Sequence, residues 1–273
     1  MRKLIFMLLF SSFLFPDDRL RLKKANVLEN KIINGESIKF ISGDVILTKG
    51  TLTLNCQEGR HYERKGLAVL YRLVIAIQEG RTLTCDTLKF FSADDKIISV
   101  GSPHIWDQDY DLKADSLTVF TEIDSGVALG NVILIQKGQT ITADRIEYQK
   151  NLEKDGLSYI AYGNVTIQDS SRIATCGKAK YDRTNEITNL ELKPEITDNG
   201  RILSGEKIIL TYQKEELQKL HIPKKAFAIT PVNGYEKSKF DSLIFGNSLK
   251  FHDKMEGSLL TGHFINGELD SLR

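Results

Sequence analysis

Apolar residues alternate with polar ones along most of this chain, which is the pattern of half-buried β-strands. The alternation recurs in a core that reads apolar–x–small–Asp–x–apolar–x–aromatic, seen best at 82–90, 111–119 and 140–148. The small residues of these three copies lie 29 residues apart, a period that predicts a stacked, repeat-built architecture. Degraded copies bring the count to about seven, with the small position filled by Cys56, Cys85, Ala114, Ala143, Cys176, Gly205 and Gly246.

The alternation changes phase within each core, directly after the Asp. In the copy at 140–148, Ile141 and Ala143 share one face, whereas Ile146 and Tyr148 resume one position late. A slip of one residue turns every later side chain to the opposite face, so keeping the apolar face buried requires a bulge or a corner here. Asp suits a bend, because its carboxylate can accept backbone N–H hydrogen bonds.

A second landmark, Val or Pro, precedes each core by nine residues and is often introduced by Gly-Asp-Val or Gly-Asn-Val. A third apolar segment, such as 97–100 or 127–129, closes the repeat. We therefore predict about three short strands per repeat. No linker divides the chain, so we expect one β-repeat domain over 25–273. The best helical periodicity, at 214–220, predicts a helical turn or a loop insertion.

The three cysteines all occupy the small position of the repeat, where other copies have Ala or Gly. A free Cys behaves as a small hydrophobe in a core, so the repeat explains these residues as structural filling. Cys56 and Cys85 fall on adjacent rungs, which leaves a disulfide between them as the alternative. No His lies at ligand spacing from any Cys, so no metal site is predicted.

The N-terminus differs from the rest. Arg2 and Lys3 precede an apolar run over 4–15 that is broken only by two serines. This pattern is typical of a signal peptide at 1–18, cleaved or kept as an N-terminal anchor, and it predicts export. The formal net charge of +1 provides no global field for binding nucleic acid.

Catalytic chemistry is not indicated by any motif: the sequence has no nucleophile elbow, zinc-protease or P-loop pattern. We therefore predict no catalytic residues and no cofactor. The stacked Asp86, Asp115 and Asp144 are interpreted as bend residues, with a cation ladder as the alternative. Adjacent acids such as Asp94-Asp95 are expected in solvated turns. A sugar-cleaving β-helix that assembles acids from several rungs is a third class of protein to weigh.

Two segments resemble a known family. ALGNVILIQKGQTITADRIEY (128–148) and IAYGNVTIQDSSRIATCGKAKY (160–181) are similar to repeats of the OstA-like family of lipopolysaccharide transport, which includes LptA, LptC and the N-terminal domain of LptD. The resemblance implies a twisted, partly open β-jellyroll in the periplasm that serves outer-membrane biogenesis. It also implies that acyl chains lie in an apolar interior, and that the end strands pair with other Lpt proteins or end to end with a second copy.

The resemblance together with the alternation predicts a non-enzymatic protein that carries or relays lipopolysaccharide or a related lipid. A self-associating β-solenoid scaffold without cargo is the alternative, and it requires a side-chain-filled interior. The side chains expected to meet lipid are those on the apolar face of the repeats: Leu83, Leu88, Phe90, Leu112, Leu117, Val132, Leu134, Ile141, Ile146, Tyr148, Val165 and Ile167. Near the rims, Lys137, Arg145 and Lys178 are either contacts for sugar phosphates or ordinary solvated cations.

Overall fold

The computed structural model describes residues 19–150, 156–231, 252–265 and 268–273. The expected signal peptide or anchor at 1–18 and the seventh copy of the core, around Gly246, lie outside the described residues. Within the described residues, no helix is long and apolar enough to cross a membrane.

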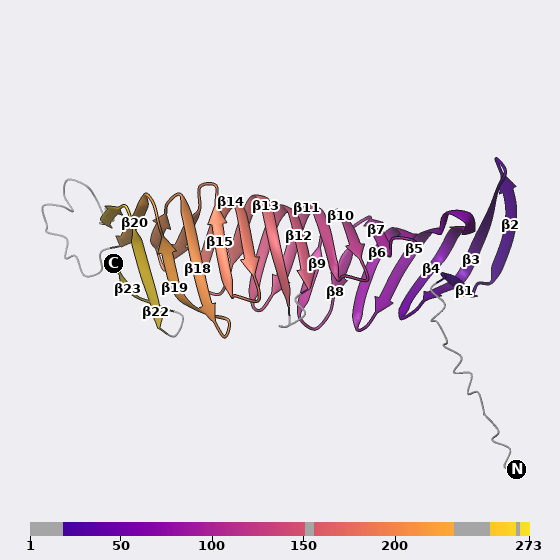
Figure 1. Ribbon diagram of the computed structural model, residues 1–273, viewed down its shortest axis with the longest axis horizontal. Coiled ribbons are helices and arrows are strands. Elements are labelled where there is room, and N and C mark those ends of the chain that lie inside the picture. Colours follow the sequence, from indigo (N-terminus) through magenta and orange to yellow (C-terminus); the bar gives the residue numbers. More distant parts are fainter. Residues whose placement is uncertain (1–18, 151–155, 232–251, 266–267) are drawn as a thin grey trace, which may run out of the picture.

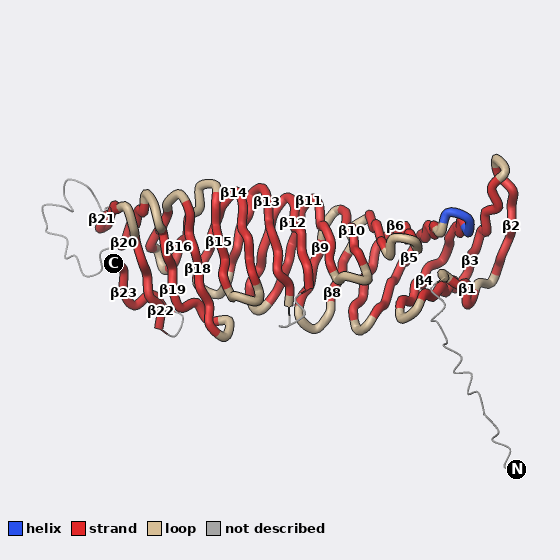
Figure 2. Tube along the Cα trace, in the orientation of Figure 1, coloured by secondary structure: helices blue, strands red, loops and turns tan. Residues whose placement is uncertain are grey.

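Most of the described residues lie in β-strands, and one short 3-10 helix, η1 (Glu63–Lys65), interrupts them. Figure 1 shows the strands stacked along one long axis, and Figure 2 shows loops mainly where strands end. The strands up to the middle of the chain are β1 (Arg21–Lys24), β2 (Val27–Ile33), β3 (Glu36–Lys49), β4 (Leu52–Tyr62), β5 (Leu67–Gln78), β6 (Arg81–Phe91), β7 (Lys96–Val100), β8 (His104–Trp106), β9 (Tyr110–Lys113), β10 (Ser116–Phe120), β11 (Ser125–Gln136) and β12 (Gln139–Lys150).

The remaining strands are β13 (Leu157–Gln168), β14 (Arg172–Asp182), β15 (Ile187–Glu191), β16 (Glu195–Asp198), β17 (Arg201–Ser204), β18 (Lys207–Gln213), β19 (Glu216–Ile222), β20 (Ala226–Pro231), β21 (His252–Gly257), β22 (Leu260–Ile265) and β23 (Glu268–Leu272). All pairings among these strands are antiparallel and join consecutive or nearly consecutive strands. The all-β class expected from the alternation is confirmed.

Two hydrogen-bonded ladders run side by side along the stack. One passes from β6 through β7 and β10 to β11, and we call it the β7 ladder. The other passes from β6 through β8 and β9 to the same β11, and we call it the β8 ladder. Long strands such as β6 and β11 contribute one half to each ladder. The apolar residues of both ladders form one core cluster, so the ladders pack face to face.

A corner joins the two ladders in the middle of each long strand. On β12, the burial pattern passes from Ile141 and Ala143 to Ile146 and Tyr148, as the predicted phase slip requires. At the same level of the neighbouring β11, Gly130 and Asn131 both have positive φ. The register between β11 and β12 shifts here, between Leu129 and Val132. Two residues on one strand therefore face one residue on the other, which is a β-bulge.

The same corner recurs along the stack. A pair of residues at positive φ comes directly before each Val or Pro landmark. These pairs are 43–44, 72–73, 101–102, 130–131, 163–164 and 192–193. Gly and Asn tolerate this left-handed region, whereas the Arg72-Leu73 and Leu192-Lys193 pairs adopt it at a steric cost. The landmark residues then turn back into the core, and Val45, Val74, Val132 and Val165 are all about 1% exposed.

The Asp of the core and the Gly-Asn of the landmark are partners across neighbouring strands. Asn131 Nδ2 donates to Asp115 Oδ2 at 2.8 Å, and Asn164 Nδ2 donates to Asp144 Oδ2 at 3.0 Å. The Asp115 N–H also donates to the Gly130 carbonyl at 2.9 Å. The expected bend is therefore present, but in these two copies an Asn side chain rather than a backbone N–H group donates to the carboxylate.

Two expectations from the sequence need correction. The third segment and the landmark form separate short strands in some copies, as β7 and β8 do. In others they are one strand: 127–129 and 132–134 are halves of β11, because the corner leaves that strand continuous. Residues 216–222 form strand β19 rather than a helical turn or a loop insertion. Leu217 and Leu220 share the buried face at a spacing of three because the register to β18 shifts between them, which imitates helical periodicity.

An additional corner lies upstream of the first predicted copy. The Asn26 N–H donates to the Gly43 carbonyl at 2.9 Å, as the Asp115 N–H does to that of Gly130. The side chain of Asn26 lies against Gly43, so Asn26 takes the place of the Asp. The Ala-Asn pair at 25–26 was the only sequence signal for this corner, because β1 and β2 are short and mostly exposed.

The corner glycine is predicted to be required for close packing as well as for its φ. A Cβ at Gly130 would overlap the Asp115 carboxylate, whereas a Cβ at Gly138, in a turn of similar φ, would meet nothing within 4 Å. Gly138→Ala should lower the free energy of unfolding by about 1 kcal/mol, the cost of the left-handed conformation alone. Gly130→Ala should lower it by about 2 kcal/mol or more. Equal losses in urea denaturation would contradict the packing role of this glycine.

Candidate functional site: the apolar interior and its seam

The interior between the two ladders contains every residue that the sequence nominated for lipid contact. All twelve belong to one buried cluster, and none is more than 7% exposed. They come from both ladders: Leu134 pairs with Leu112 and Ile141 in the β8 ladder, whereas Ala128 pairs with Leu117 and Ile146 in the β7 ladder. The structure thus places these side chains in one continuous apolar layer that follows the long axis.

Side chains fill this interior. One cavity of about 20 Å³ lies among buried residues including Leu52, Leu83 and Ile105, and one of about 30 Å³ lies among Ile167, Leu203 and Leu220. Each has room for one or two water molecules and not for an acyl chain. Lipid can occupy this interior only if the two ladders move apart.

The cysteines are free and buried, as the filling interpretation predicts, and the alternative disulfide between Cys56 and Cys85 is absent. Each pairs directly with a landmark valine: Cys56 with Val45, Cys85 with Val74 and Cys176 with Val165. Burial raises the pKa of Cys56 and Cys176 to about 11 and that of Cys85 to about 12. These thiols are therefore protonated and unreactive near neutral pH as long as the core stays closed.

Charged side chains close the interior on the side opposite the corners. We call the turns at the far ends of each ladder tips, and the line along which the tips of the two ladders meet the seam. Lys49, at a tip of the β8 ladder, donates to both carboxylate oxygens of Asp95 at 2.8 Å and to the Ser92 carbonyl at 2.7 Å. Its side chain is only 4% exposed. Asp95 thus lies in a buried ion pair rather than in the solvated turn that the sequence predicted.

The same kind of contact recurs along the seam. Arg81, 9% exposed at the next tip of the β8 ladder, pairs with Asp124 of the β7 ladder. Lys150 of the β7 ladder pairs with Asp107 of the β8 ladder at 3.3 Å.

Two more contacts follow further along the seam after these three ion pairs: a neutral one and then another ion pair. The Gln136 side chain donates to the Leu157 carbonyl at 3.0 Å and accepts the Leu157 N–H at 2.5 Å. Lys137 then pairs with Glu215 at 3.3 Å. Five successive contacts therefore join the two ladders across the seam within the described residues.

Polar groups also lie just inside the seam. The Tyr148 hydroxyl and Arg81 Nε are buried and have no hydrogen-bond partner in the structure. Burial raises the pKa of Tyr148 well above its usual range. Gly126 makes room for this ring, because a Cβ there would lie 2.5 Å from the Tyr148 hydroxyl oxygen. The interior is therefore apolar near the corners and more polar near the seam.

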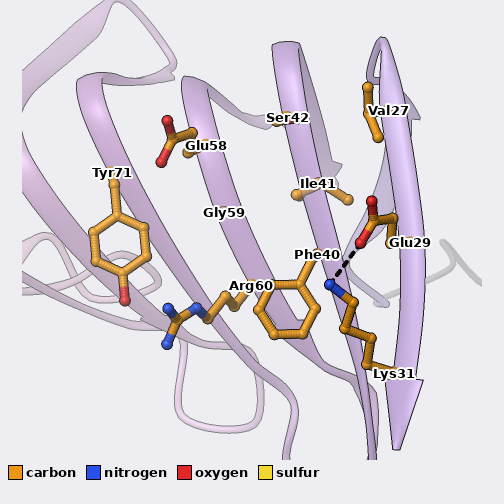
Figure 3. A pocket seen from close by; sticks show the side chains of 10 residues that line it. All are labelled: Val27, Glu29, Lys31, Phe40, Ile41, Ser42, Glu58, Gly59, Arg60 and Tyr71. Atoms are coloured by element: carbon orange, nitrogen blue, oxygen red, sulfur yellow. Dashed lines mark ion pairs between the residues drawn. The ribbon is translucent and has the colours of Figure 1, made fainter.

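A wider cavity, about 300 Å³, lies outside the core near the N-terminal edge, as Figure 3 shows. Arg60 lies over the rings of Phe40 and Tyr71, at 5.4 Å and 5.9 Å from their centroids. No sequence pattern indicated this cavity, because most of its side chains occupy the outward positions of β2 to β5. The rim cations noted from the sequence each have an acidic partner: Lys137 has Glu215, Arg145 has Glu147 and Lys178 has Glu191.

The fold and the interior define a repeat-built, all-β protein that encloses a long apolar layer between two ladders. Residues 111–216 match the family described as LptA/(LptD N-terminal domain) LPS transport protein. The resemblance read from the sequence is thereby confirmed over these residues, which are similar to that lipopolysaccharide transport family. That family is one of transport rather than of catalysis.

Among solved structures, a match is the crystal structure of LptH, the LptA homologous periplasmic component of the lipopolysaccharide transport device from Pseudomonas aeruginosa. The two chains are 16% identical, with a TM-score of 0.36, over 54% of this chain and 94% of that chain. No curated protein matches the chain.

Folding stability should depend on His61, which is 7% exposed. Burial lowers the pKa of His61. The unfolded chain therefore binds this proton more readily than the folded one, and stability is lost as the pH falls below about 6.5. Between pH 7.5 and 5.5, the native protein should lose more stability in urea titrations than a His61→Gln variant. His263→Gln, at an exposed position, should behave like the native protein. An identical pH response of all three proteins would contradict the assignment.

Proposed function

We propose that this protein carries or relays lipopolysaccharide, or a chemically related lipid, through the periplasm toward the outer membrane, with acyl chains held between the two ladders. The match of residues 111–216 to a lipopolysaccharide transport family is the observation that carries this proposal. The buried apolar layer supports it, because it offers a continuous surface for acyl chains along the whole stack.

The energetics of such binding need no catalytic group. Each CH₂ removed from water contributes about 0.8 kcal/mol, so a few ordered acyl chains can offset the loss of side-chain contacts as the ladders separate. Side chains such as Leu134 and Ile141 would then exchange protein contacts for lipid contacts. Within the described residues, no group of three or more His, Cys, Asp or Glu is placed to hold a metal ion.

The N-terminal end of the stack offers an edge for partners. Among the described residues, β2 pairs only with β3, so one side of its backbone has no partner strand there. Val27, Leu28, Ile32 and Ile33 on this strand are between 44% and 78% exposed. An unprotected edge with exposed apolar residues favours strand addition, which supports pairing with another Lpt-type protein or with a second copy of this chain.

A cargo-free scaffold is the second candidate. The filled interior is the observation that it explains directly, since a scaffold needs no cavity. The family match favours transport over this alternative.

A photo-crosslinking amino acid at Ile141 or Ile146 tests the proposal in cells. Both residues are 1% exposed or less, and they represent the β8 and β7 ladders, respectively. Lipopolysaccharide adducts should form at both positions on irradiation. Ile133, an outward residue of β11 that is 39% exposed, is the matched control and should give no adduct.

Adducts that form equally at the inward and outward positions would show nonspecific contact. If inward positions along the whole core remain without lipid while the protein is folded and exported, the transport function is excluded and the scaffold remains.

A further inference from the structure

The seam holds charged residues where a permanently closed fold would be expected to hold apolar ones. Lys49 and Arg81 are among the few buried charged residues of the described chain, and both lie at tips of the β8 ladder. Their partners Asp95 and Asp124 lie at tips of the β7 ladder and are 16% and 24% exposed. A buried ion pair is weak evidence for stability, because apolar residues of similar size often stabilise as well or better.

An ion pair at such a position lowers the free-energy cost of separating the two tips. When two apolar tips separate, both surfaces become exposed to water at full cost. When Lys49 and Asp95 separate, water solvates both charges and recovers much of the lost interaction energy. Closure by ion pairs at the rim therefore makes the seam easy to part while the corners, which are backbone-bonded, stay intact.

The positions of the pairs fit this role. The corners are held by continuous backbone ladders, whereas the seam contacts described above involve a side chain in every case. The tips of one ladder are also tied to one another: the Thr121 N–H donates to the Asp95 carbonyl at 2.9 Å, and the Lys150 N–H donates to that of Asp124 at 2.8 Å. Separation at one latch would thus part the neighbouring tips together, with each ladder staying intact.

We propose that the Lys49–Asp95, Arg81–Asp124 and Lys150–Asp107 pairs are latches that control sideways access to the apolar interior along the seam. An acyl chain would enter between parted tips rather than thread from an end of the stack. The assignment of lipid as the occupant rests on the proposed function, whereas the opening of the seam does not, and the two can be tested separately.

The opening is measured without lipid through the native thiols. Cys56 and Cys85 lie on strands that reach the Lys49 and Arg81 latches, whereas Cys176 lies on β14, remote from both. In an Asp95→Asn/Asp124→Asn variant, alkylation of Cys56 and Cys85 by N-ethylmaleimide should accelerate about tenfold, the effect of weakening a charge-assisted hydrogen bond. The rate at Cys176 should not change, because this residue is remote from both latches. Global unfolding, in contrast, would accelerate alkylation of all three cysteines.

A matched control removes two carboxylates from exposed ion pairs away from the seam. Glu63 pairs with Lys39 and Glu206 pairs with Lys225. Glu63→Gln/Glu206→Gln makes the same change in net charge and should leave all three alkylation rates unchanged. Equal acceleration in the two variants, or none in the seam variant, would overturn the latch.

Lipid access is tested by tethering the seam. In a background with all three cysteines replaced by Ala, the residue present at the same slot in other copies, Lys49→Cys/Asp95→Cys is joined by a short bismaleimide. Loading of purified lipopolysaccharide should slow at least about tenfold, since the tether prevents the tips from separating across the seam. Thr51→Cys/Glu79→Cys is the control tether, because these residues lie at adjacent tips of one ladder, with a side-chain contact of 3.3 Å.

Equal loading of both tethered proteins would overturn sideways access. If thiol exposure responds as expected but no protein binds lipopolysaccharide, the latch stands and the proposed function fails.

Discussion

The fold depends on the corner where one Asp faces two residues at positive φ. A strand that changes ladder must keep its apolar face inward on both sides of the change, and alternation alone would turn it outward. The extra residue on the Gly-Asn strand supplies the bend, and the Asp of the adjacent strand fills the space over the glycine. Because the corner recurs with the repeat, every long strand bends at the same depth and the two ladders stay in register.

The seam follows from the corner. Once the corners are fixed on one side, the tips of the two ladders must meet on the other, and the sequence places Lys49, Arg81 and Gln136 there. The result is an interior with two unlike borders: a backbone-bonded border at the corners and a border of side-chain contacts at the seam. A protein that must hold an apolar guest and release it requires such a difference, because parting both borders would unfold it.

The filled interior is compatible with this view. Folded cores are close-packed, and an empty apolar groove of the size of an acyl chain would lose many dispersion contacts. In the structure the interior is closed, and residues such as Leu134, Ile146 and Tyr148 belong to one buried cluster. Lipid would replace those contacts rather than fill a pre-existing void.

Much of this arrangement could be predicted from the sequence, and the failures have physical reasons. The repeat period, the small position at Cys85 and the phase slip after Asp144 are local features, so the sequence alone predicts them. The corner at Asn26 was missed because the strands around it are exposed and carry little alternation. The strand at 216–222 was missed because a bulge gave its leucines helical spacing. The seam could not be predicted, because Lys49 and Asp95 are 46 residues apart and each resembles a solvated turn residue.

If the interior opens along the seam when lipid enters, a distance measured across the seam must increase. Spin labels at Thr51 and Asp94, exposed at tips of opposite ladders, report this distance in a cysteine-free background. Labels at Thr51 and Glu79, on one ladder, provide the reference. Bound lipopolysaccharide should lengthen the first distance and leave the second unchanged. Bound lipid with no change across the seam would contradict this opening.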